Sequence, residues 1–206
     1  GYLHTLLDGA IYDENINLKY LKRAATNVDR LQTIVDDLEV INKLESDKST
    51  LKSSVFELDA LVKEIFEDLK MVADDKGISL KFKNDSEKGV RVSADREGIR
   101  QVLNNLIINS IKYGNEGGTT KVSFYNMDKK ILVEVSDDGP GIAEKHLKHL
   151  FDRFYRIDNS RSRKVGGSGL GLSIVKHIIE AHKQSINVRS TIGVGSTFGF
   201  TLSKGI

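Results

Sequence analysis

Residues 17–44 carry the feature that most constrains the fold of this chain, an apolar stripe with helical spacing that neither Gly nor Pro interrupts. The apolar positions recur at steps of three and four residues: Leu18, Leu21, Ala25, Val28, Leu31, Ile34, Val35, Leu38, Ile41 and Leu44. This spacing predicts one long amphipathic helix of about 40 Å at 1.5 Å per residue. Because such a helix cannot bury its apolar face alone, it needs a packing partner.

A shorter apolar stripe precedes this helix and predicts a second one. It consists of Tyr2, Leu3, Leu6, Leu7 and Ala10, and it ends near Gly9. The segment Asp13-Glu14-Asn15 then offers turn and N-cap chemistry for the long helix. Residues 1–46 therefore predict a helical hairpin that is cut short at its start. We expect a homodimer, formed through a four-helix bundle; the alternative is that the hairpin packs on the chain's own globular domain.

Residues 47–206 show a different pattern, which predicts a second domain. Residues 45–54 are polar and indicate a linker that runs into a first short strand. Helices are expected at 58–73, 95–113 (with Asp95 as N-cap) and 170–182, and strands at 78–83, 90–92, 121–126, 131–136, 186–191 and 196–202. Strands and helices are mixed and several strands are joined as hairpins. The fold class predicted is α+β, a two-layer α/β sandwich with helices on one face of a largely antiparallel sheet.

The composition excludes several classes of function. The 31 basic and 29 acidic residues leave a net charge of +2, which predicts no affinity for nucleic acid or for a membrane surface. Without cysteine, the chain has no disulfide, no thiolate zinc site and no cysteine nucleophile. No apolar run approaches the roughly 18 residues of a membrane span. We expect a soluble piece, and the start at Gly1-Tyr2 suggests a fragment or a processed chain.

The loop Asp137-Asp138-Gly139-Pro140-Gly141-Ile142 directly follows the predicted strand 131–136. A carboxylate therefore emerges at a strand end, where a ligand crevice can form, and the only proline of the chain stiffens the loop between two glycines. Taken alone, this pattern is weak, because an acidic Gly/Pro turn after a strand is often only a turn.

On the predicted helix 95–113, Asn105, Asn109 and Lys112 share one face at i, i+4 and i+7. Carboxamides on an otherwise apolar helix are costly to bury unless a partner satisfies them, and a hard cation or a phosphate oxygen could do so. The alternative is that they cap backbone groups of a neighbouring loop.

The segment 164–173 runs several glycines directly into a helix, where backbone N–H groups and the helix dipole form a cradle for an anion. It fits neither a Walker A loop nor a dinucleotide fingerprint. Before it lie Phe151, Phe154, Tyr155 and Arg156, followed by the basic residues of 161–164. This combination predicts a hinged lid over a phosphate ligand.

Taken together, these elements resemble the N, G1, F and G2 boxes and the closing Gly-x-Thr element of sensor histidine kinases, the ATP-binding proteins of two-component systems. In chain order they are Asn105-x-x-x-Asn109, Asp137-x-Gly139-x-Gly141, Phe151-x-x-Phe154, Gly167-x-Gly169-x-Gly171 and Gly195-Ser196-Thr197-Phe198. The resemblance covers essentially the whole chain, including the hairpin. It implies a Bergerat ATP-binding fold for residues 47–206, with ATP and Mg²⁺ as ligands.

The resemblance also implies a role for each matching residue. Asp137 would accept a hydrogen bond from the adenine amino group, with Thr197 supporting it through water. Asn109 would ligate Mg²⁺, and Asn105 would help to place the metal or the phosphates. Lys112 would meet phosphate and Tyr113 would pack on adenine. The remaining nucleotide-binding positions would be Gly139, Gly141, Ile142, Phe154, Gly167, Ser168, Gly169, Leu170 and Gly171. Arg156, Arg161 and Arg163 are candidates to neutralise charge on the γ-phosphate, and with Asn105 and Lys112 they form the expected catalytic set.

Asn105 favours a kinase over an ATPase. Type II topoisomerases, mismatch-repair ATPases and the heat-shock chaperone ATPase carry Glu at that position to activate water, and a carboxamide is a poor general base. The alternatives are an ATPase of this superfamily and a non-catalytic dimeric scaffold.

The Asp36-Asp37 pair of the predicted long helix is expected on a solvated helix face.

The family's phospho-accepting histidine lies in an H-E-x-x-T/N-P box that precedes a Gly-Tyr like Gly1-Tyr2. By that register the box lies outside the 206 residues, and His4 lacks the Glu and Pro of the box. We therefore expect ATP binding without self-phosphorylation. The expected partners are a second copy of the chain and the receiver domain of a response regulator. The expected location is the cytoplasm, in a sensor that other segments anchor to a membrane.

Overall fold

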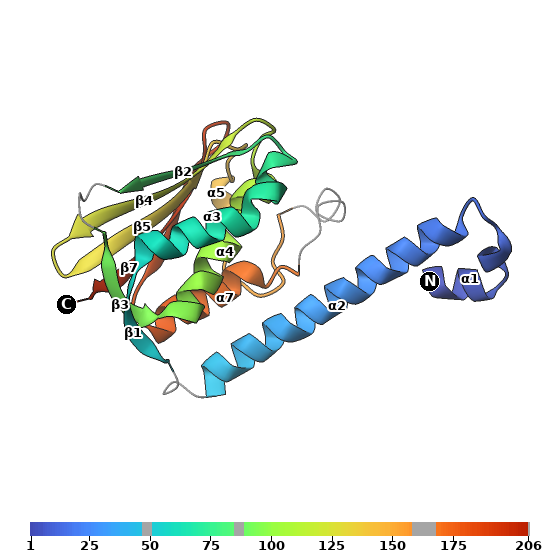
Figure 1. The fold of residues 1–206 in the computed structure, drawn as a ribbon, viewed down its shortest axis with the longest axis horizontal. Coiled ribbons are helices and arrows are strands. Elements are labelled where there is room, and N and C mark those ends of the chain that lie inside the picture. Colours follow the sequence, from blue (N-terminus) through green and yellow to red (C-terminus); the bar gives the residue numbers. More distant parts are fainter. Residues whose placement is uncertain (47–50, 85–88, 158–167, 206) are drawn as a thin grey trace.

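The structure is a computed structural model that describes residues 1–46, 51–84, 89–157 and 168–205. Helices cover one face of a mixed sheet, and a long helix extends away from this body (Figure 1). The strands are β1 (Ser53–Glu57), β2 (Ser79–Asn84), β3 (Arg91–Asp95), β4 (Thr119–Met127), β5 (Lys130–Asp137), β6 (Ile186–Thr191) and β7 (Gly195–Lys204). The helices are α1 (Tyr2–Leu7), η1 (Ala10–Tyr12), α2 (Asn17–Ser46), α3 (Leu58–Asp74), α4 (Arg96–Tyr113), α5 (Glu144–Leu147) and α7 (Gly171–Ala181).

The sheet has the order β1-β3-β7-β5-β4-β2, and β6 pairs with β7 beside β3. All of these pairings are antiparallel except β2 with β4, which is parallel. β4 and β5 form the predicted hairpin, with Met127 opposite Lys130 across a tight turn. The prediction of an α+β domain with helices on one face of a largely antiparallel sheet is confirmed. The four-residue helix α5 was not predicted from the sequence.

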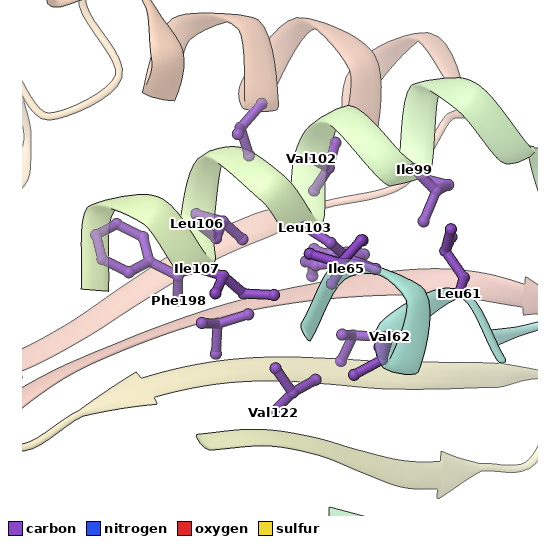
Figure 2. Close-up of a cluster of buried hydrophobic side chains, with 14 of the residues drawn as sticks. Leu61, Val62, Ile65, Ile99, Val102, Leu103, Leu106, Ile107, Val122 and Phe198 are labelled. Carbon is purple, nitrogen blue, oxygen red and sulfur yellow. The ribbon is translucent and has the colours of Figure 1, made fainter. Parts of the chain in front are cut away.

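The core lies between this sheet and α3, α4 and α7. Figure 2 shows apolar side chains of α3 and α4 directed at one another and at Val122 of β4 and Phe198 of β7. α3 contributes a helical stripe whose members are all buried: Leu58, Leu61, Val62, Ile65, Leu69 and Ala73. Each fully buried Leu, Ile or Val side chain stabilises the fold by about 1.5–3 kcal/mol relative to an exposed one. The sheet and these helices therefore form a rigid two-layer body, on which the candidate site described below is built.

Both ends of α4 are satisfied by side chains. At the N-terminus, Oδ1 of Asp95 accepts hydrogen bonds from the backbone N–H groups of Glu97 and Gly98, each at 3.1 Å, which confirms the predicted N-cap. At the C-terminus, the Nζ of Lys76 donates to the carbonyl oxygens of Ile111 at 3.0 Å and of Lys112 at 2.6 Å. A cation there also complements the helix dipole. These contacts fix the helix that carries Asn105 and Asn109.

The N-terminal segment contains the expected short helix and the expected long one. α1 ends before Gly9, whose φ of 111° allows the chain to turn into η1 and then into α2. The rings of Tyr2 and Tyr20 lie 5.5 Å apart, so α1 contacts the start of α2. None of the helices within the described residues is both long enough and apolar enough to span a membrane.

The apolar residues of α2 divide into two groups. Ile41 is fully buried in the core of the globular domain, and Ile34 and Leu38 pack against that core. Leu21, Val28, Leu31 and Val35 are exposed instead. The C-terminal half of α2 thus packs on the chain's own domain, as the alternative proposed, and the four-helix dimer stays a prediction.

Candidate functional site

Asp137 is the last residue of β5 and forms one end of the candidate site. Its Oδ1 accepts hydrogen bonds from the backbone N–H of Gly139 at 3.0 Å and of Ser196 at 3.2 Å. Burial raises the pKa of the Asp137 carboxyl, and the two backbone donors partly offset that shift. Since Oδ1 is used internally, Oδ2 is the oxygen left to accept a hydrogen bond from a ligand.

The loop after Asp137 has two positions, 139 and 141, where only glycine fits. A Cβ added at Gly139 would lie 2.8 Å from Oδ1 of Asp137 and 3.3 Å from the carbonyl oxygen of Tyr113. Gly141 has φ +71°, and a Cβ there would lie 2.1 Å from the carbonyl oxygen of Thr191. The glycines therefore let the loop pass close to the end of α4 and to the β6–β7 turn.

Ile142 and Thr197 flank this end of the site. The backbone N–H of Ile142 donates to Oγ of Ser190 at 2.8 Å, and that hydroxyl donates to the carbonyl oxygen of Gly195 at 2.9 Å. Thr197 lies in β7, where its register partners are Ser136 of β5 and Arg189 of β6. The strand ends of β5, β6 and β7 are therefore joined around Asp137.

α4 supplies the second side of the site. Asn105, Asn109 and Lys112 are half-buried on this helix, as their shared face predicted, and Tyr113 ends the helix with its side chain 50% exposed. A Cβ added at Gly171 would lie 3.2 Å from Oδ1 of Asn105. The asparagine row therefore lies beside the first residue of α7.

The segment before α7 supplies the third side. Gly169 has φ +76°, and its carbonyl oxygen accepts a hydrogen bond from the N–H of Phe154 at 3.0 Å. Within the described residues, the N-cap residue Leu170 makes no side-chain capping hydrogen bond, so the first N–H groups of α7 can serve an anion. Phe154 is 56% exposed, whereas the Leu170 side chain lies fully in the core and its backbone N–H already donates to Oγ of Ser168 at 3.2 Å.

Lys112 lies in a positively charged environment at this side. Burial lowers the pKa of its ammonium group, and the positive charges of Arg30 and Arg156 lower it further. Positive charge around Lys112 makes this side of the site favourable for an anion. Three of the predicted residues, Arg161, Arg163 and Gly167, lie outside the described residues.

Two residues near this cradle were missed by sequence reasoning. The hydroxyl of Ser168 donates to Oδ2 of Asp37 at 2.8 Å, and burial raises the pKa of the Asp37 carboxyl. The expectation that Asp37 lies on a solvated face was therefore wrong, although its neighbour Asp36 is exposed. Arg30 is the second, and it lies two turns before Asp37 on the same face of α2. Both side chains are distinguished from the exposed residues of α2 only by being half-buried. The sequence pattern does not show this burial.

The donor set fits a magnesium nucleotide better than a metal bound by protein alone. Among the described residues, no group of three or more His, Cys, Asp or Glu side chains could hold a metal ion. The amide oxygens of Asn105 and Asn109 are hard ligands, and Mg²⁺ typically combines one or two protein ligands with phosphate oxygens and water. Oδ2 of Asp137 offers an acceptor to a base at one end, and Lys112 with the positive N-terminal end of α7 offers charge to phosphates at the other.

Comparison with known proteins identifies the family. Residues 94–206, more than half of the chain, match the family described as histidine kinase-, DNA gyrase B- and HSP90-like ATPase, and the chain belongs to this family. It is 32% identical over 201 residues to the phosphate regulon sensor protein PhoR of Pseudomonas aeruginosa, covering 96% of this chain and 44% of PhoR. It is also 32% identical over 205 residues to the sensor histidine kinase WalK of Bacillus subtilis, covering 98% of this chain and 33% of WalK. The chain thus spans less than half the length of these relatives.

Solved structures share the fold. The Acinetobacter baumannii histidine kinase AdeS superposes with a TM-score of 0.81 at 26% identity, covering all of this chain and 93% of AdeS. Histidine kinase ThkA, in its complex with response regulator protein TrrA, superposes with a TM-score of 0.72 at 30% identity, covering 91% of this chain and 51% of ThkA. The described domain therefore has the arrangement of the ATP-binding domains of this family.

Proposed function

We propose that this chain is the ATP-binding core of a sensor histidine kinase, which uses Mg-ATP to phosphorylate a histidine outside these 206 residues. The observation that carries the proposal is the meeting of three elements. The β5 end brings Asp137, α4 brings the row Asn105, Asn109 and Lys112, and the α7 N-terminus lies against Asn105. An acceptor for a base at one end and an anion cradle at the other match a nucleoside triphosphate.

Each side of the site has a separate task in this proposal. Oδ2 of Asp137 accepts a hydrogen bond from the adenine amino group, which selects adenine over guanine. Lys112 and Arg156 neutralise phosphate charge, together with the N–H groups at the start of α7. Tyr113 packs on the base, since it is the exposed aromatic residue next to Gly139. Asn109, assisted by Asn105, would hold Mg²⁺, which would supply neutralisation of phosphate charge.

The reaction needs positioning more than covalent chemistry by this domain. A nitrogen of the acceptor imidazole forms a bond to the γ-phosphorus while the bond from that phosphorus to the bridging oxygen breaks. The electron pair leaves with ADP, and the phosphohistidine then passes its phosphoryl group to an aspartate of a response regulator. Asn105 supports this direction of the chemistry, because a carboxamide does not activate water for hydrolysis.

Two partners are part of the proposal. A second copy would pair through the exposed apolar residues of α2, since a row of this kind is typical of a helical interface. A response-regulator receiver domain would receive the phosphoryl group; ThkA, which shares the fold, was solved in complex with a response regulator.

The test is phosphoryl transfer to a supplied acceptor. The protein is incubated with Mg²⁺ and ATP labelled at the γ-phosphate, with a separate helical hairpin that carries an H-E-x-x-T-P box. Acid-labile, base-stable label on the hairpin is expected, with none when its histidine is replaced by Gln. Steady release of phosphate without labelling would favour an ATPase instead. Undetectable nucleotide binding by an intact dimer would favour a scaffold.

A further inference from the structure

β6 brings a serine to the Asp137 end of the site, and its hydroxyl contacts both segments that surround Asp137. This residue, Ser190, is half-buried and pairs with Ser196 of β7, which pairs in turn with Asp137 of β5. The backbone N–H of Ile142, in the loop after β5, donates to Oγ of Ser190 at 2.8 Å. The same Oγ lies 2.9 Å from the carbonyl oxygen of Gly195 and 2.9 Å from Oγ of Ser196. One side chain of β6 therefore joins the loop after β5 to the start of β7.

The number of protons determines the direction of these hydrogen bonds. A serine hydroxyl has one proton to donate and two lone pairs that can accept. Because Ser190 donates its proton to the carbonyl oxygen of Gly195, the hydroxyl of Ser196 must be the donor in the bond between the two serines. With the N–H of Ile142 as its second donor, Oγ of Ser190 uses its whole hydrogen-bonding capacity. A hydroxyl with every partner in place is held in one orientation.

The peptide group between Gly195 and Ser196 connects Ser190 to Asp137. Its carbonyl oxygen accepts the hydrogen bond from Ser190, and its N–H donates to Oδ1 of Asp137 at 3.2 Å. Since a peptide group is planar, a rotation that breaks one of these hydrogen bonds also misaligns the other. Gly195 has φ +133°, and a glycine leaves the backbone free to turn unless other contacts hold it. Ser190 therefore holds the backbone donor that orients the carboxylate of Asp137.

We propose that Ser190 is a positioning residue for recognition of the base, which acts through this peptide group to direct Oδ2 of Asp137 at the ligand. The inference rests on the proposed function and adds a residue of β6 to it. Ser190 itself contacts neither base nor phosphate. Without its hydroxyl, the peptide group is less restrained and the side chain of Asp137 can take other rotamers. The affinity for the base then falls, because Asp137 must be ordered when the ligand binds, and the affinity for phosphate does not.

The test compares three ligands: ATP, adenosine and inorganic triphosphate, which has no base. Ser190→Ala is expected to lower the affinity for ATP and for adenosine by about fivefold each, which corresponds to the loss of one hydrogen bond. Triphosphate binding should stay unchanged. In an Asp137→Asn background, Ser190→Ala should change ATP affinity by less than about twofold, because residues of one hydrogen-bond network are energetically coupled. Isothermal titration calorimetry with Mg²⁺ measures ATP, and NMR titration measures the other two ligands.

The matched control is Ser203→Ala, at the opposite end of β7. Ser203 is also half-buried, and its hydroxyl accepts a hydrogen bond from Nε2 of Gln184 at 3.1 Å. The control removes a serine hydroxyl and a hydrogen bond from the same sheet, away from the candidate site. It should therefore leave the affinity for all three ligands unchanged.

The outcomes separate this inference from the function on which it rests. If the unaltered protein binds ATP and Ser190→Ala binds it equally well, Ser190 positions nothing. An equal loss of triphosphate binding, or a loss of the same size in the Asp137→Asn background, would show that Ser190 does not act through Asp137, and the inference is wrong. If Asp137→Asn binds ATP as well as the unaltered protein does, the adenine role of Asp137 fails and this inference fails with it, whereas ATP binding stands. If the unaltered protein binds no ATP, the proposed function itself fails.

Discussion

Asp137 is half-buried at the end of β5, where its two oxygens have different surroundings. Oδ1 accepts two backbone N–H groups, and Oδ2 is the acceptor proposed for adenine. Asp137→Asn keeps an oxygen for the backbone donors but replaces the ligand acceptor by an N–H₂ donor. We expect about a tenfold or greater loss of ATP affinity, because a hydrogen bond to a charged group is lost and a donor then faces a donor. Calorimetry measures this, and equal affinity would contradict the adenine role.

Asp137→Asn should lower ATP affinity but raise the stability of the fold relative to the original protein as pH increases. Burial raises the pKa of Asp137 in the folded state, so its favourable contribution is fully present below the unfolded pKa and is lost as pH rises through the folded pKa. Asp137→Asn carries no such charge. The unfolding free energy of the variant minus that of the original protein should therefore increase with pH across that range. Urea denaturation at several pH values measures it, and a difference that falls with pH would contradict the assigned burial.

Residue types alone predicted one half of this site better than the other. Asp137, Asn105 and Asn109 could be proposed from the sequence because a carboxylate at a strand end and carboxamides on an apolar helix face are unusual positions; their roles stay predictions. Asp37 could not, because a charged residue on an amphipathic helix is solvated unless that face docks on another domain. Arg30 was missed for the same reason. Docking of a helix face depends on tertiary contacts that spacing does not encode.

At the scale of elements, local chemistry determines α4 closely. Asp95 caps its first turn, and the same carboxylate accepts a hydrogen bond from the N–H of Lys52 at 3.1 Å through Oδ2. Asp95→Ala should lower the unfolding free energy by about 0.5–2 kcal/mol, the usual range for loss of an N-cap. Asp95→Asn retains an Oδ1 acceptor and should lose less. Denaturant titration measures the unfolding free energy of both variants. Equal losses would show that the hydrogen bonds accepted by Oδ1 contribute little to stability.

The expected elements agree with the structure where sequence signals are local. The helix 95–113 and the hairpin of β4 and β5 follow from an N-cap residue, helical spacing and alternation, all of which act within a few residues. Longer strands were underestimated at their ends: β7 runs from Gly195 to Lys204, past the expected 196–202. Its last residues pair with β3, and pairing between distant strands is not visible in a local pattern.

At the scale of the whole molecule, α2 presents two apolar rows to different surroundings. One row contacts the globular domain through Ile34 and Ile41, and the other exposes Val28, Leu31 and Val35. At 100° per residue the two rows lie roughly a third of the helix circumference apart. The sequence predicted one apolar stripe and one partner for it, because spacing at three and four residues does not separate two adjacent rows.

The exposed row makes the association of two copies testable without disturbing the nucleotide site. Val28 and Leu31 are 60% and 63% exposed, and a contiguous apolar row in water is stabilised by burial against a second helix. The double variant Val28→Glu, Leu31→Glu should shift the protein from dimer to monomer, since Glu keeps helix propensity but repels across the seam. Light scattering after size exclusion, over a concentration series, measures the mass. Thr33→Glu, which places the same charge at an exposed position away from the row, is the matched control and should stay dimeric.

Because the row that contacts the domain is left intact, the monomeric variant should bind ATP with the affinity of the original protein. That result would separate association from nucleotide binding. A monomeric mass for the original protein at every concentration would contradict the dimer. A joint loss of association and ATP binding in the double variant would show that the two faces of α2 act as one unit.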